Sequence, residues 1–187
     1  MRFDGGRVCL DLAMAAGREE GLPDPRRLTA WLYGSGLVPA GTAVRPAADW
    51  PQRFAVLRDL LARLATAEVD GHGPTAPDIV ALNGFARPAP PAPAAVGADD
   101  GTGLRRTLAA PPTCEALLSA VARDAVDLFT DPLARTLLRR CEGEHCARIY
   151  LDTSRGRRRR WCSSEICGNR ERVARHRRRS TTTAAQG

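Results

Sequence analysis

Residues 139–170 have the sequence RRCEGEHCARIYLDTSRGRRRRWCSSEICGNR, which holds four of the six cysteines in two pairs. Four residues separate Cys141 from Cys146, four separate Cys162 from Cys167, and fifteen lie between the pairs. Paired spacing of this kind is typical of a metal site, because Zn²⁺ prefers a tetrahedron of four ligands and binds thiolates readily. We therefore predict a closed structural zinc site formed by Cys141, Cys146, Cys162 and Cys167.

A bound metal would also explain how so short a region folds. Roughly forty residues bury too little apolar surface to offset chain entropy, whereas zinc binding contributes about 10 kcal/mol or more. Two disulfides or four unrelated thiols are the alternatives, and both are less favoured because paired cysteines in an intracellular protein indicate metal. His145 is a further ligand candidate, although four cysteines already complete the zinc coordination.

The positive charge of the chain is concentrated in the same region. Residues 139–179 contain fourteen Arg and five acidic residues, a balance of +9, so the remainder of the +7 chain carries −2. Such a cluster attracts phosphates, and each phosphate neutralised by Arg releases condensed counterions. Because the chain has no Lys, the clustering and not the choice of Arg carries the prediction of a polyanionic partner.

Local signals predict the order of elements in this region. The β-prone run at residues 149–151 indicates a strand or hairpin, and residues 152–156 read as a turn. Ser163 or Ser164 can cap a helix that runs to about Arg179 and carries Cys167 in its first turn. A cysteine knuckle, a strand or hairpin and then a helix make the predicted zinc finger treble-clef-like.

Two groups of residues are the predicted nucleic-acid contacts. The run before the third cysteine suits phosphate contact, and the predicted helix would present further cations to solvent. Asn169 either pairs with an adenine edge or holds the backbone of the knuckle, whereas Trp161 is expected to pack over the zinc site. The contact residues are Arg155, Arg157, Arg158, Arg159, Arg160, Asn169, Arg170, Arg172, Arg175 and Arg177.

Residues 151–155, 159–163 and 167–170 resemble the CGNR zinc finger family, which is named for Cys-Gly-Asn-Arg, here residues 167–170. The resemblance covers essentially the whole finger. It implies a bacterial transcription regulator whose finger binds DNA through its arginines, with the four cysteines as zinc ligands.

The rest of the chain predicts a helical domain, so that the fold class is mainly α (α+β) with a few short strands. A cap at Asp24 and Pro25 predicts one helix, and Pro51 begins a longer one with an apolar face. Further helices are expected at residues 76–85, with Ile79, Leu82 and Phe85 inward, and at 115–129. Residues 3–12 fit a strand or a helix, 87–103 a loop or linker, and 104–109 a strand.

The predicted organisation is an amino-terminal domain over residues 1–133, the zinc finger over 134–179 and a flexible tail over 180–187. No apolar run reaches eighteen residues, and the start lacks a secretory signal. We therefore expect a cytoplasmic protein that makes no membrane contact and is nucleoid-associated when bound.

The amino-terminal region resembles the domain usually found ahead of the CGNR finger, the ABATE-type "putative stress-induced transcription regulator" domain. The resemblance is carried by Gly-Gly-Arg-Val-Cys-Leu-Asp-Leu at residues 5–12 and by the order of the helices. It implies a stress response and a domain that senses a small-molecule ligand or a partner. Residues 13–18 depart from the Asn-Thr-containing continuation expected there, so this copy would bind a different ligand or none.

The sequence thus predicts a zinc-dependent, DNA-binding transcription regulator. An RNA-binding module and a protein-interaction zinc module are the alternatives, because the same charge would serve them. We expect no enzyme, since a zinc ion held by four thiolates has no open position for water and no Ser/His/acid arrangement stands out. A single finger that makes mostly phosphate contacts would gain specificity as a homodimer.

Overall fold

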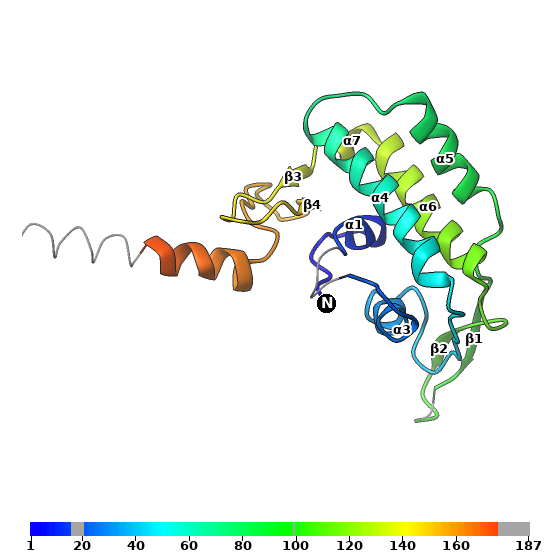
Figure 1. Cartoon of the computed structure of the whole chain (residues 1–187). Coiled ribbons are helices and arrows are strands. Elements are labelled where there is room, and N and C mark those ends of the chain that lie inside the picture. The colour runs from blue at the N-terminus through cyan, green and yellow to red at the C-terminus, as the bar shows by residue number, and fades with distance from the viewer. Residues whose placement is uncertain (16–20, 99, 176–187) are drawn as a thin grey trace, which may run out of the picture.

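The structure is a computed structural model that describes residues 1–15, 21–98 and 100–175. A helical part is followed by a small cysteine-containing part with two short strands and a projecting helix, as Figure 1 shows. This arrangement confirms the predicted mainly α class and the finger at its carboxyl end. The predicted contact Arg177, the end of the predicted helix and the tail at 180–187 lie outside the described residues.

Two long helices form the centre of the helical part. α4 (Trp50–Val69) and α6 (Cys114–Thr130) pack together, α5 (Ala76–Ala86) lies along α6, and α3 (Pro25–Gly34) contacts α4. The predicted apolar face of α4 is buried from Phe54 to Leu64. Burial of each large apolar side chain contributes about 1.5–3 kcal/mol, so this face anchors the fold.

α1 (Val8–Ala13) resolves the ambiguity of residues 3–12 in favour of a helix. It contacts both α4 and α6, and Cys9, Leu10 and Leu12 are all buried. A strand would have placed alternate residues on opposite faces, whereas this short helix is surrounded by core on several sides. It therefore buries consecutive residues, including the charged Asp11.

Two predictions for the helical part are wrong. The expected loop at residues 87–103 contains β1 (Pro93–Gly97), which pairs antiparallel with β2 (Leu104–Leu108). Both strands are largely exposed, so no alternation of apolar residues marks them in the sequence. Ile79 of α5 is 44% exposed instead of inward, and Leu82 is the fully buried residue of that helix.

The finger is joined to the helical part through its own strands. After the short α7 (Pro132–Arg135), β3 (Leu138–Arg140) pairs antiparallel with β4 (Ile149–Leu151). Side chains alternate along β4: Ile149 and Leu151 belong to the helical core, whereas Tyr150 packs with the cysteines. One strand thus contributes side chains to two cores.

Among the helices that the structure describes, none has the length and apolar character of a membrane span.

Candidate metal centre

The fold brings the four predicted ligands together. Cys141 follows β3, Cys146 precedes β4, Cys162 ends the intervening loop, and Cys167 lies in a π-helical turn over Ser164–Gly168. The four sulfur atoms all lie within 4.8 Å of one another. Within residues 1–15, 21–98 and 100–175 this is the one cluster of three or more Cys, His, Asp or Glu side chains able to share a metal.

The sulfur positions fit a tetrahedral zinc ion. The Sγ atoms of Cys146 and Cys162 are 3.8 Å apart, and those of Cys162 and Cys167 are 3.6 Å apart. Zn–S bonds of about 2.3 Å give a tetrahedron whose edges are about 3.8 Å. All six cysteines are free thiols, so neither pair is a disulfide. Zn²⁺ is therefore the cofactor that this cluster is built to hold.

His145 takes no part in the cluster. Its side chain is 90% exposed and its ring lies 3.9 Å from the carboxylate of Glu144. Its backbone has a positive φ of 61°. His145 is therefore not a ligand candidate in this structure.

Close packing at Gly143 joins the two cysteine pairs. A Cβ atom at this position would lie 3.1 Å from the Cβ of Cys167 and 3.4 Å from the Sγ of Cys141. The Gly143 N–H donates to the Sγ of Cys141 at 3.5 Å, and the Cys162 N–H donates to the same sulfur at 3.3 Å. Burial raises the pKa of Cys141, but these two N–H groups, together with the side chains of Cys146 and Cys162, outweigh burial and leave the pKa below its usual value.

The second pair is built on a capped helix, as predicted. The Ser163 side chain accepts a hydrogen bond from the Ile166 N–H at 3.2 Å, and after the π-helical turn residues 169–175 are α-helical. Trp161 packs against the cysteine cluster, and its ring would lie 3.4 Å from a Cβ at Gly168. The expectation that Trp161 packs over the zinc site is confirmed.

A buried carboxylate organises the loop between the pairs. Asp152 accepts hydrogen bonds from the Ser154 N–H at 3.0 Å, the Ser154 hydroxyl at 2.6 Å and the Arg159 N–H at 3.0 Å. Burial by itself would raise the pKa of Asp152. The hydrogen bonds lower the pKa by more than burial raises it, so the net shift is downward. Asp152 therefore stays ionised and holds the turn that leads to Cys162.

Arg159 is half-buried, and its guanidinium makes most of its contacts within the finger. Its guanidinium donates to the carbonyl oxygens of Trp161, at 2.8 Å, and of Cys162, and it lies over the Tyr150 ring at 4.6 Å from the centroid. The Tyr150 hydroxyl in turn donates to the Arg159 carbonyl at 2.5 Å. These bonds position the third ligand, and the assignment of Arg159 as a nucleic-acid contact stays a prediction.

The other described contact residues are exposed. Arg160 pairs with Glu142 at 2.6 Å and lies over Trp161, and Arg172 donates to the Ser164 carbonyl at 3.5 Å. The Asn169 side chain makes no hydrogen bond with the part of the chain that the structure describes, so it does not hold the knuckle there. Five of these arginines are exposed and form no ion pair with a described residue: Arg155, Arg157, Arg158, Arg170 and Arg175.

One residue at the metal centre escaped sequence analysis altogether. The Nη2 atom of Arg2 lies 3.1 Å from the Sγ of Cys162 and 4.0 Å from that of Cys167. No pattern in the sequence relates residue 2 to residue 162, and only the tertiary structure brings them together.

Comparisons with known proteins agree with this geometry. A family model described as "Putative stress-induced transcription regulator" (ABATE) matches residues 6–132, and one described as "CGNR zinc finger" matches residues 137–180. A search of curated proteins gives no match. The first match covers more than half of the 187 residues, and the second contains all four clustered cysteines. The chain therefore belongs to the ABATE family and carries a CGNR zinc finger after its ABATE domain.

Proposed function

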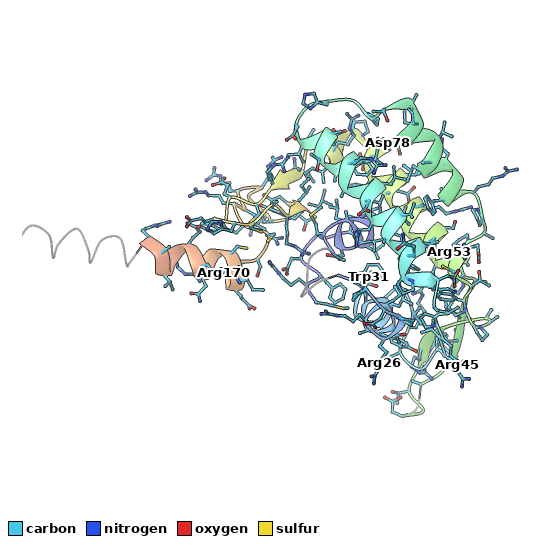
Figure 2. All side chains as sticks on the ribbon, in the orientation of Figure 1. Arg26, Trp31, Arg45, Arg53, Asp78 and Arg170 are labelled. Carbon is cyan, nitrogen blue, oxygen red and sulfur yellow. The ribbon has the colours of Figure 1, made fainter. Side chains whose placement is uncertain are left out.

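We propose that this protein is a zinc-dependent, DNA-binding transcription regulator, with the finger on DNA and the helical domain sensing a ligand or a partner. The observation that carries the proposal is the helix at residues 169–175, which starts at the cysteine cluster and extends away from the helical part (Figure 1). It exposes Arg170, Arg172 and Arg175. Figure 2 shows Arg170 on this helix, well away from Trp31 in the helical core.

The zinc site favours a structural and not a catalytic role for the metal. Four thiolates complete the tetrahedron, so no position remains for a reacting water. The exposed arginines, in contrast, provide planar forks that suit phosphate oxygens and guanine edges. We assign the loop residues Arg155, Arg157 and Arg158 to phosphate contact. We assign Asn169 and Arg170 to the groove, where an α-helix fits.

Anisotropy titrations with labelled duplex DNA and with structured RNA test this function. We expect tighter binding to the duplex and a steep loss of affinity between about 50 and 200 mM salt, as for a protein with several phosphate contacts. Replacing both Arg170 and Arg175 with Gln should lower the affinity for the duplex. Arg26→Gln, on the exposed surface of α3, is the control with the same charge change per site.

Three outcomes would contradict the proposal. Tighter binding to structured RNA would favour the RNA-binding alternative. No binding to either nucleic acid would favour a protein-interaction module. Equal effects per charge removed in the α3 control and in the finger variant would show that binding follows net charge and not this helix. The binding stoichiometry from the same titrations tests the proposed homodimer, since two chains per duplex are expected for paired half-sites.

A cavity in the helical part is our candidate for the sensing site. It encloses about 270 Å³ between α4, α5, α6 and α7, and most of its lining is apolar, including Leu64, Ile79 and Phe129. The Arg135 Nε atom is 2.8 Å from a carboxylate oxygen of Glu68, and this ion pair forms the polar side. The cavity suits a small, mostly apolar ligand with one polar group.

Indole, used as a probe of this size and chemistry, should raise the melting temperature of the intact protein. Ile79→Trp, which fills the cavity wall, should abolish that rise. Val80→Trp, on the neighbouring residue of α5 that is 70% exposed and outside the lining, is the control and should leave it unchanged. An equal indole response in all three proteins would exclude this cavity.

A further inference from the structure

Arg2 is held in a fixed orientation beside the metal centre. Its Nε atom donates to the Asp4 carboxylate at 2.9 Å, and its side chain is only 16% exposed. The opposite edge of the guanidinium then points Nη2 at the Sγ of Cys162, 3.1 Å away, with the Sγ of Cys167 at 4.0 Å. An arginine fixed by a carboxylate on one side and aimed at sulfur on the other is an oriented donor.

The four sulfurs differ in where their hydrogen bonds come from. Cys141 receives N–H groups of Gly143 and Cys162, both from the finger itself. Among the described residues other than the four cysteines, Arg2 is the one that donates to the sulfurs of Cys162 and Cys167. A zinc tetrathiolate carries a net charge of −2, so a guanidinium at this distance stabilises it electrostatically. The second cysteine pair thus depends on a residue outside the finger.

The backbone around Arg2 is docked on the finger. The Leu151 N–H donates to the Gly5 carbonyl at 2.9 Å, and the buried Arg148 donates to the carbonyls of Met14 at 3.2 Å and Arg2 at 3.4 Å. Gly6 has a φ of +78°, and a Cβ there would lie 3.4 Å from Leu151. The segment before α1 therefore follows β4 closely enough to bring Arg2 to the sulfurs.

We propose that Arg2 belongs to the zinc site as a positioning residue that donates to the metal-bound sulfurs of Cys162 and Cys167. The CGNR finger of this protein is then completed by the amino-terminal segment that leads into the ABATE match at residues 6–132, and zinc occupancy is coupled to docking of this segment, residues 2–6. The proposal rests on the zinc site alone and stands or falls independently of DNA binding.

Zinc competition with a chromophoric chelator, performed on the full chain, is the first test. Arg2→Gln should weaken zinc binding by about 10- to 100-fold, the usual effect of removing a hydrogen bond to a metal ligand. Arg2→Lys keeps the cation but loses the fork, and should fall between Arg2→Gln and the natural protein. With Co²⁺ in place of zinc, the sulfur-to-metal charge-transfer band should shift in Arg2→Gln, because the thiolates have lost a donor.

Mapping of iodoacetamide alkylation separates this role from a general loss of stability. In Arg2→Gln the zinc-loaded protein should react faster at Cys162 and Cys167 than at Cys141 and Cys146. Arg7→Gln is the matched control, because Arg7 pairs with Asp124 at 2.8 Å to hold α1 on α6. It should leave the order of reactivity unchanged. Natural zinc affinity and alkylation order in Arg2→Gln would overturn the proposal, as would the same changes in Arg7→Gln.

Discussion

At the scale of single residues, Asp152 makes a sharp prediction. This fully buried carboxylate accepts three hydrogen bonds in the loop that leads to Cys162. Asp152→Ala leaves those donors without a partner, and each buried unsatisfied donor costs about 1–3 kcal/mol. We expect urea denaturation of the zinc-loaded protein to show a free energy of unfolding lower by at least that amount. Asp127→Ala, at an exposed site on α6, should stay within about 0.5 kcal/mol of the natural protein.

Asp11 predicts that the stability of the protein depends on pH. Burial raises its pKa to about 6, against the partial compensation of the Gly5 N–H and Arg148, while Asp4 and Asp124 add to the rise. A raised pKa means that the folded state binds the proton more tightly than the unfolded chain. Its contribution to stability is therefore greatest at low pH and is lost as the pH rises through about 6.

Asp11→Asn removes this titration and keeps an acceptor for the Gly5 N–H. Between pH 5 and 7 the free energy of unfolding of the natural protein should fall relative to that of Asp11→Asn, by about 1 kcal/mol. Denaturation curves of both zinc-loaded proteins over this range measure the difference. Parallel pH profiles would show that Asp11 titrates normally.

At the scale of elements, the helix that carries Cys167 depends on its cap. Ser163 accepts from the Ile166 N–H, and loss of such a cap costs about 1 kcal/mol. Ser163→Ala should lower the free energy of unfolding by about this amount and loosen the fourth ligand, seen as faster zinc loss to a chelator. Ser164→Ala, at the adjacent exposed position beyond the cap, should change neither quantity.

At the scale of the whole molecule, β4 links zinc binding to the stability of the helical part. Ile149 and Leu151 pack in the same core as α1, α4 and α6, while Tyr150 packs with the cysteines. Chelation of zinc should therefore destabilise the entire chain. The expected change is about 2.7 kcal/mol when free zinc is initially about a hundred times its dissociation constant. Calorimetry should show one transition that moves to lower temperature. Two transitions, of which only one responds to the chelator, would contradict this coupling.

The sequence by itself determined the features whose causes are local. Each of these features can be recognised from a short stretch of sequence. They are the cysteine spacing, the cap at Ser163, the apolar faces of α4 and α6 and the strand at residues 149–151. Periodicity and capping act over one or two helical turns, so a single segment shows them. For this reason the amino-acid sequence is enough to predict the zinc cluster and the long helices.

Only the tertiary structure decided what each local element faces. It made residues 8–13 a helix, paired β1 with β2, exposed Ile79 and turned Arg159 inward. It also placed Arg2 beside Cys162, a contact across 160 positions of the chain. Such contacts depend on which surfaces meet when the core closes. A pattern in one segment carries no information about a partner that distant in the sequence, so these choices are made by packing.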